Sequence, residues 1–321
     1  MTRYILGRLA MLPLTLLVVS FATFSFIHLA PGDAVDVMLA LSPDSTEEQR
    51  DMLRAEAGLD DPFFAQYFRW LGDAVTGDLG ESVNTGQPVS EMLAERMPVS
   101  FQLAVYAITM AIAIGLLMGA IAVRWRESWV DRGIMFLSTG GMSVPSFFFG
   151  TVAIYMISVY FPSYGVLTYT PFTESPLKNL QGLFFPALSI ALVTGSVFIR
   201  YFRGAAEDIL RSTDYVRTAR SKGASERRVV RKHVLPNALI PLVTVAGLQF
   251  GFLIGGTVVI ETVFALPGLG RMIMTGVETR NYPVVQGGVV LLAIGFVLIN
   301  LIIDLLYPIL DPRVRLSDRT E

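Results

Sequence analysis

The chain has 321 residues, of which 53% are hydrophobic and only 16% are charged, and its mean hydropathy is +0.55. Soluble domains carry about 25% charged residues, so this composition predicts an integral membrane protein. The net charge of −2 says little, but the absence of cysteine excludes disulfides, cysteine-ligated metal centres and a thiol nucleophile. The two histidines, His28 and His233, are far apart in the sequence, and no His/Glu pattern predicts a metal site.

Six stretches are apolar over the roughly 20 residues that a helix needs to cross a bilayer. They predict an all-α integral membrane protein with six transmembrane helices. The predicted spans are Tyr4–Leu29, Val99–Val123, Gly133–Phe161, Leu183–Arg200, Asn237–Ile260 and Pro283–Leu310. Asp304 lies near the end of the last span, where we expect pairing with an arginine of a loop or neighbouring subunit in preference to proton transfer.

The first span begins beside Arg3 and Arg8, as a secretory signal peptide would. Its apolar run is longer than the roughly 7–15 residues of a signal-peptide core. Pro31 also follows the only small-residue candidate for a cleavage site. We therefore expect a retained helix.

Basic residues alternate between the loops and predict how the chain crosses the membrane. The loop Pro31–Pro98 has four Lys or Arg against fourteen Asp or Glu, whereas Arg124–Arg132 has three basic residues in nine and Arg200–Pro236 has ten. Loops rich in Lys and Arg stay in the cytoplasm. We expect both termini to be cytoplasmic and Pro31–Pro98 to be external.

The external loop contains the apolar and aromatic pattern FFAQYFRWLGDAV, which predicts short helices near the outer membrane surface. The predicted organisation is a first span within residues 1–30, an external loop 31–98, a five-helix core 99–310 and a cytoplasmic tail 311–321.

Four features within or beside the spans can each be interpreted either as structural or as part of a transport path. Pro145 predicts a kink, which suits a helix near a translocation path and ordinary helix contacts equally well. Glu261 could line an outer mouth, but we favour a structural role. Phe147–Phe149 and the pair Gly255–Gly256 are expected to contact lipid or other helices rather than substrate or a gate.

The segment RTARSKGASERRVVRKHVLP concentrates positive charge between two apolar spans. Asp214–Ser221 and Ser225–Leu235 are predicted as short helices, the second with Ser225 as its N-cap. Gly223 lies between them, where a sharp reversal needs a positive φ. Pro236 is expected to end the second helix. The segment is either a topology signal on anionic lipid or a docking surface for a cytoplasmic protein, and its ordered layout favours docking.

The sequence DYVRTARSKGASERRVVRKHVLPNALIP resembles the cytoplasmic loop of bacterial ABC importer permeases. That loop reads EAA, three residues, Gly, nine residues, Ile, one residue and Leu-Pro. Arg217-Thr218-Ala219 takes the place of EAA, and His233 that of the isoleucine. These departures, together with LAPGD, RWLGDAVTGDLGESVNTGQPV, ETVFALPGLGRM, RNYPVVQG and LLYPILDPR, resemble the first-permease branch of the dipeptide, oligopeptide and nickel importers.

The resemblance implies a type I ABC importer transmembrane domain that pairs with a second permease. It also implies one or two cytoplasmic ATPases, which bind ATP and Mg²⁺, and an external solute-binding protein. No nucleic acid is expected. The segment 201–236 would couple this chain to an ATPase, and a bulky residue at Gly223, such as Gly223→Asp, would uncouple transport. The docking residues carried over are Asp214, Tyr215, Arg217, Thr218, Ala219, Gly223, Leu235 and Pro236. In addition, Arg217 and Arg220 could bond to carboxylates of the partner.

The sequence contains no nucleotide-binding loop of its own. A P-loop needs Gly-Lys-Ser/Thr, but the three lysines, Lys178, Lys222 and Lys232, are followed by Asn, Gly and His. We therefore expect a transport subunit without ATPase activity. A stand-alone secondary transporter is the alternative, although it would need more ionisable groups inside the spans. An intramembrane enzyme lacks a candidate set of nucleophile, base or metal ligands.

Peptides are the expected substrate, with nickel chelates and glutathione as alternatives within the resemblance. No residue is assigned to substrate binding. Selection is expected to come largely from the external binding protein.

Overall fold

The computed structural model describes residues 2–29, 52, 55, 60–161 and 169–310. The LAPGD motif, most of the first half of the predicted external loop, and the tail lie outside this part, as does the side chain of Asp304. Within the described residues all regular secondary structure is helical, apart from one isolated antiparallel bridge between Glu81 and Pro88. The all-α prediction is therefore confirmed.

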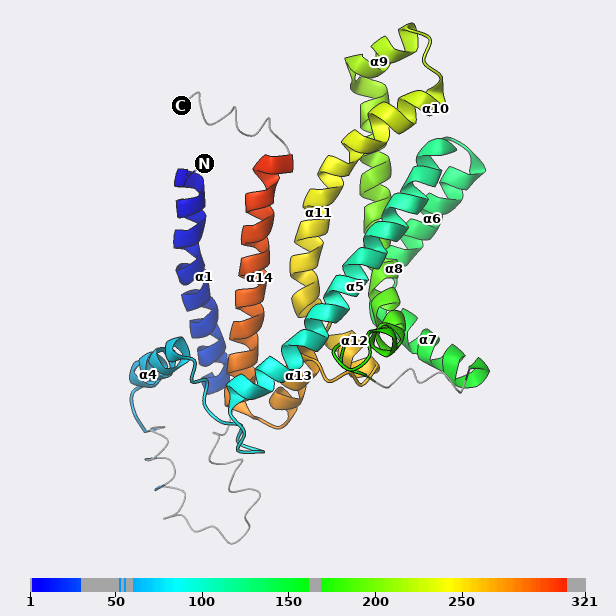
Figure 1. Ribbon diagram of the computed structural model, residues 1–321. Helices are drawn as coiled ribbons and strands as arrows, with labels where there is room; N and C mark the ends of the chain where they lie inside the picture. The colour runs from blue at the N-terminus through cyan, green and yellow to red at the C-terminus, as the bar shows by residue number, and fades with distance from the viewer. Residues whose placement is uncertain (1, 30–51, 53–54, 56–59, 162–168, 311–321) are drawn as a thin grey trace. The chain divides into compact units, whose positions relative to one another are not determined.

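Five continuous helices are long and apolar enough to cross a membrane in the described part of the chain. A sixth span is formed if α6 and α7, which bend by 97° at their junction, are counted together. The helices are α1 (Thr2–Leu29), α4 (Phe63–Thr76), α5 (Val89–Arg124), α6 (Trp129–Ser143), α7 (Ser146–Tyr160), α8 (Pro176–Ser212), α9 (Asp214–Ser221), α10 (Glu226–Val229), α11 (Leu235–Gly256), α12 (Val258–Val263), α13 (Leu269–Glu278) and α14 (Tyr282–Leu310) (Figure 1).

The chain forms two compact units. Unit 1 comprises Met1–Ser100 and Pro267–Val297, and unit 2 comprises Phe101–Leu266 and Leu298–Glu321. The long helices α5 and α14 contribute to both units.

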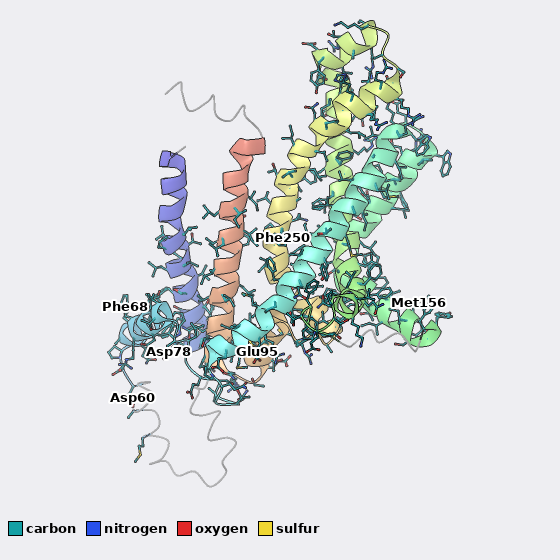
Figure 2. The ribbon with its side chains drawn as sticks, in the orientation of Figure 1. Asp60, Phe68, Asp78, Glu95, Met156 and Phe250 are labelled. Carbon is teal, nitrogen blue, oxygen red and sulfur yellow. The ribbon has the colours of Figure 1, made fainter. Side chains whose placement is uncertain are left out.

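In unit 1, α4 packs on α1 through aromatic side chains. Tyr67 is buried, its ring lies edge-on to Phe24, and its hydroxyl is 3.0 Å from the hydroxyl of Ser20. His28 Nε2 is 3.0 Å from Gln66 Oε1, which ties the end of α1 to the same helix. Phe68, the residue after Tyr67 in α4, is exposed (Figure 2). The predicted helical pattern is confirmed, and His28 has a structural role.

A second cluster in unit 1 joins the start of α5 to α13 and α14. Its buried members are Val89, Leu93, Leu269, Met272 and Val284. The buried amide of Asn281 donates to Ser82 Oγ over 2.7 Å, and its oxygen accepts from the backbone N–H of Val83. The motifs RWLGDAVTGDLGESVNTGQPV and RNYPVVQG are thus held together by buried hydrogen bonds.

Unit 2 is organised around α8, which extends well beyond the predicted span Leu183–Arg200 at both ends. Ser175 caps its start, and its apolar face continues past Arg200 at intervals of four residues, the spacing of one helix face. The buried residues in this stripe are Phe198, Phe202, Ala206 and Leu210. Hydropathy ends at Arg200, but helical periodicity does not, so the helix runs on into the charged segment.

Glycines let α5 approach α8 closely. A Cβ atom built on Gly115 would collide with Phe198, and one on Gly119 would lie 2.7 Å from the ring of Phe202. Small residues at such spacing permit close helix contacts in membranes.

Replacing Gly115 with leucine should therefore destabilise unit 2. Overpacking a filled contact costs about 1–3 kcal/mol, and this one meets Phe198 next to its backbone. The thermal unfolding midpoint of the detergent-purified protein should fall. Gly133→Leu is the matched control, because no atom lies within 4 Å of a Cβ there. Equal midpoints for the two variants would contradict the proposed contact.

The predicted third span is broken rather than kinked. Helix α6 ends at Ser143, and α7 starts at Ser146 after Pro145, whose missing N–H and restricted backbone prevent the helix from continuing. Ser138 on α6 donates to the carbonyl of Ser196 on α8 over 2.7 Å. Helix α7 packs against α8 and α12, and exposes Met156 (Figure 2).

Glu261 is fully buried in α12, and Thr257 donates to its carboxylate over 2.7 Å. This favours the structural interpretation over a place at an open mouth. Phe147 and Phe148 are about half exposed, as expected for side chains that face lipid. No described atom lies within 4 Å of a Cβ built on Gly255 or Gly256. Any close helix contact at this pair would therefore come from outside the described chain.

Candidate functional site

The charged segment forms the helical hairpin that the sequence predicts. Helix α9 spans Asp214–Ser221 as expected, and Gly223 follows it with φ +78°. The Gly223 N–H donates to the Arg220 carbonyl over 2.9 Å, and the Ala224 N–H to the Ala219 carbonyl over 3.1 Å. These two bonds define a Schellman turn, which requires the left-handed conformation that glycine adopts most readily. A Cβ built on Gly223 meets nothing within 4 Å, so the requirement is conformational.

One face of this hairpin is anchored in the core of unit 2. Val216 of α9, Val229 of α10 and Val234 before α11 are fully buried. They join the cluster that contains Phe202 and Leu210 of α8. Figure 1 shows α9 and α10 beyond one end of α8, with α7 beside the other end. The hairpin is therefore fixed to the longest helix of its unit.

The opposite face of α9 is open. Asp214, Arg217 and Thr218 are exposed, and Tyr215 is exposed by 41%. Arg217 lies 3.8 Å from Asp214, a contact between exposed side chains that contributes little stability. Ala219 and Leu235 are partly buried against the core, whereas Pro236 is exposed. The eight carried-over residues thus divide into an exposed set and an anchoring set.

Arg220 has a carboxylate within its own chain. Its guanidinium lies 2.8 Å from Glu226 Oε1, and Arg126 lies 3.6 Å from the same oxygen. This contact crosses the turn at Gly223 and holds α9 against the start of α10. Arg217 remains the arginine of the predicted pair that faces outward.

The prediction that Pro236 ends the second helix is wrong. Helix α10 passes through a π-helical turn, Val230–Val234, directly into α11, and together they run from Glu226 to Gly256. Leu235 donates to the carbonyl of Val230, five residues earlier. This wider turn accommodates a residue that has no N–H and whose ring clashes with a normal helical carbonyl. Ser225 takes the N-cap position, but its side chain makes no capping hydrogen bond.

A buried ion pair joins α6 to α8 near the hairpin. Arg203 donates through Nε to Asp131 Oδ1 over 2.8 Å and through Nη2 to Oδ2 over 2.9 Å. The side chain of Asp131 is only 4% exposed, and its carboxylate also accepts from the Glu127 N–H. Arg203 continues to Glu207 over 2.7 Å, and Glu207 to Arg211. This arrangement fixes the α5–α6 connection to the helix that carries the hairpin.

This ion pair was not predicted from the sequence, in which the segment Arg124–Arg132 stands out only for its basic residues. A usable signal was present, since Ser128 and Asp131 have the spacing of a helix N-terminus, and the Ser128 side chain accepts from the Asp131 N–H. The partner on α8 had no comparable signal.

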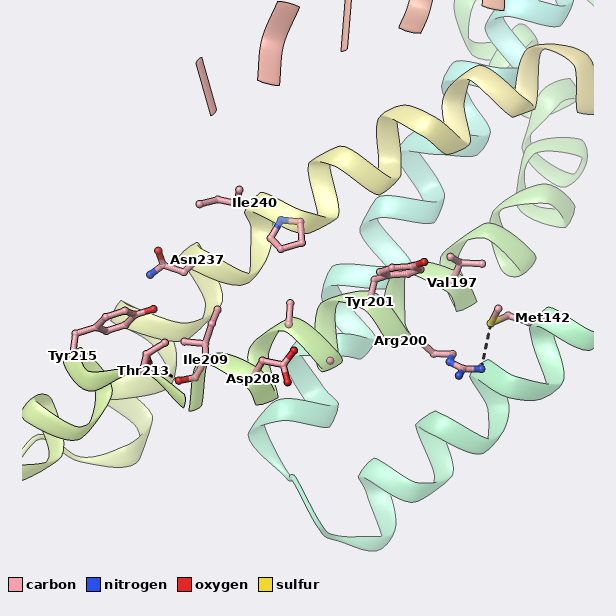
Figure 3. Close-up of a pocket in the computed structure, with 13 residues that line it drawn as sticks. Met142, Val197, Arg200, Tyr201, Asp208, Ile209, Thr213, Tyr215, Asn237 and Ile240 are labelled. Carbon is pink, nitrogen blue, oxygen red and sulfur yellow. Dashed lines mark hydrogen bonds between the residues drawn. The ribbon is translucent and has the colours of Figure 1, made fainter. Parts of the chain in front are cut away.

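A cavity of about 1090 Å³ lies in unit 2 beside α8 (Figure 3). Its walls come from the end of α6, one stripe of α8, the start of α9 and the first turns of α11. The polar and aromatic side chains around it include Arg200, Tyr201, Asp208, Tyr215 and Asn237. The described residues contain no group of three or more His, Asp or Glu side chains placed to hold a metal ion.

A chain of several apolar spans with a charged hairpin fixed to its longest helix is an architecture suited to a membrane transport subunit. A family model described as the binding-protein-dependent transport system inner membrane component matches residues 111–316. A model for the N-terminal part of such membrane components matches residues 1–104. The chain therefore belongs to this family of multi-pass membrane proteins, the ABC importer permeases, and the resemblance drawn from its motifs is confirmed.

Relatives agree with this assignment over almost the whole chain. A Brucella abortus (strain 2308) protein named as a peptide transport system permease is 43% identical over 318 residues, which cover 98% of this chain and 99% of the relative. The glutathione transport system permease protein GsiC of Escherichia coli (strain K12) is 38% identical with the same coverage. A crystal structure of an amino acid ABC transporter matches 68% of this chain and 94% of its own, with 14% identity and a TM-score of 0.45.

Proposed function

We propose that this chain is one of two permeases of a peptide importer in a bacterial inner membrane. One or two cytoplasmic ATPase subunits, which bind ATP and Mg²⁺, drive it, and an external solute-binding protein delivers the peptide. The family assignment supports a permease role. The names of the relatives support peptides, and glutathione is itself a tripeptide. A nickel chelate remains the alternative substrate.

We further propose that the exposed face of α9 docks to an ATPase subunit. The observation that carries this proposal is the two-sided hairpin, in which Val216 is fully buried while Asp214, Arg217 and Thr218 stay exposed. A partner that moves this face would move the core of unit 2, because the hairpin is anchored to α8. The charge alternation of the loops supports a cytoplasmic position for the hairpin and both termini.

The function is tested with the assembled importer in proteoliposomes, by measuring uptake of a labelled tripeptide delivered by the binding protein. Wild-type uptake should require ATP and the ATPase subunits. Uptake by the lone chain, driven by a proton gradient, would instead favour a secondary transporter.

The docking face is tested with Arg217→Ala. Loss of this exposed cation should weaken the affinity for the ATPase by about tenfold, as expected when a charge-assisted contact is lost. Affinity can be measured by titrating labelled ATPase onto the permeases in nanodiscs. Arg228→Ala is the matched control, because Arg228 is equally basic and exposed but lies outside the docking residues. Equal loss in both variants would point to general charge attraction.

A further inference from the structure

Charged side chains in the C-terminal part of α8 fall into two sets. Arg203, Glu207 and Arg211 follow one stripe and are joined by ion pairs to one another or to Asp131. Arg200 and Asp208 follow another stripe and line the cavity (Figure 3). Neither of these two residues forms an ion pair with any part of the chain that the structure describes; there the side chain of Arg200 makes a hydrogen bond only to the sulfur of Met142, over 3.8 Å. Two charges of opposite sign are thus left available to a ligand.

The spacing of these two charges is set by the helix. Arg200 and Asp208 are eight positions apart, so their Cα atoms are separated along the axis by about 12 Å. Gly204 lies midway between them on the same wall, and a Cβ built there would meet nothing within 4 Å. The floor between the two charges is therefore open to a ligand that reaches both.

The rest of the cavity suits a ligand with a polar backbone and variable side chains. Its volume of about 1090 Å³ lies just above the roughly 300–1,000 Å³ typical of small-molecule sites. Tyr201 and Tyr215 supply aromatic surface, and Asn237 supplies an amide that can both donate and accept hydrogen bonds. The remaining side chains are mostly aliphatic and offer few polar anchors, which favours recognition of the charged ends of a ligand over its side chains.

We propose that this cavity is a transit site for short peptides with free ends. Arg200 binds the terminal carboxylate, and Asp208 binds the terminal ammonium. An extended peptide covers about 3.3–3.6 Å per residue, so three or four residues match the separation of the two charges, and side-chain reach accommodates neighbouring lengths. Recognition through the termini would leave the peptide sequence free. The inference rests on the proposed function and adds a site to it.

The test measures direct binding of peptides to the assembled importer in nanodiscs, without the solute-binding protein. The probes are tri-alanine, N-acetyl-tri-alanine and tri-alanine amide. We expect R200Q to weaken tri-alanine binding by about tenfold but to leave binding of the amide unchanged. We expect D208N to weaken tri-alanine binding similarly but to leave binding of the acetylated peptide unchanged. A general structural defect would lower the affinity for all three probes together.

Arg211→Gln is the control, because this arginine lies on the same helix outside the cavity and is 70% exposed. Binding by R200Q or D208N that equals wild type, or that falls equally for free and blocked peptides, would overturn the site. So would the absence of saturable tri-alanine binding to the wild-type complex. ATP-driven tripeptide uptake is measured in parallel with the binding protein present. Uptake by an importer that shows no direct tri-alanine binding would refute the transit site and leave the proposed importer function standing.

Discussion

Gly223→Val is expected to reduce ATP-driven peptide uptake by at least about tenfold while leaving the chain inserted and assembled. Gly223 has φ +78°, a conformation that costs an L-residue about 1–2 kcal/mol and a β-branched one more. Since about 1.4 kcal/mol is a tenfold change in an equilibrium, the native turn should become about tenfold less favoured relative to alternative conformations. Helix α9 would then lose its fixed position relative to its anchor, Val216. Uptake and peptide-stimulated ATP hydrolysis in proteoliposomes measure the effect.

Gly223→Asn separates conformation from size at this turn. Asparagine tolerates the left-handed region, and the space around Gly223 is open, so this variant should keep most of its uptake. The uptake of the Gly223→Asp variant should lie between that of the valine variant and that of the asparagine variant. Equal activity of the valine and asparagine variants would show that the turn is not required for coupling. Equal loss in both would show that the partner cannot accept any side chain there.

Removing the charge of Asp131 should lower the free energy of unfolding by about 2 kcal/mol, because Arg203 loses two charge-assisted hydrogen bonds and keeps only its ion pair with Glu207. The thermal or denaturant unfolding of the purified protein carrying Asp131→Asn measures this change. We expect the loss of stability to be accompanied by loss of uptake, since the same pair fixes the α5–α6 connection to α8.

A double-mutant cycle that combines Asp131→Asn with Arg203→Gln tests whether the loss of stability comes from the interaction between these two side chains. The combined variant should be less destabilised than the sum of the two single variants, because neither charge is then left alone. Arg211→Gln, which removes a 70% exposed partner of Glu207, should cost less than about 1 kcal/mol. Strict additivity of Asp131→Asn and Arg203→Gln would show that the two side chains do not stabilise one another.

Sequence reasoning predicted the outer limits of α1 and α14 well, because apolar length alone determines them. It missed ten residues at the start of α5 and much of α8, where helices continue outside the apolar run. In α8 the continuation is carried by Phe202, Ala206 and Leu210, a stripe that the average hydropathy of a window does not detect. Pro236 was predicted wrongly because the π-helical turn before it is flanked by Val229 and Val234, whose burial in the core of unit 2 cannot be read from the sequence.

In the candidate site, too, local features could be predicted from the sequence and long-range contacts could not. Helix α9 and the positive φ of Gly223 could be predicted, since a short helix and its glycine turn depend on local chemistry. The pair Asp131 and Arg203 could not, because its members are 72 positions apart and meet only through the approach of α6 to α8. The cavity depends on four helices at once, and no single segment carries a pattern for it.

The break before Pro145 has a consequence for biosynthesis. Helices α6 and α7 have 15 residues each, so each is about 22 Å long, shorter than the roughly 30 Å hydrocarbon layer. Neither helix is therefore long enough to cross the hydrocarbon layer on its own during translation. Both halves contact α8, so we expect this part of the chain to integrate stably only after α8, which ends about 50 residues beyond α7, has been synthesised.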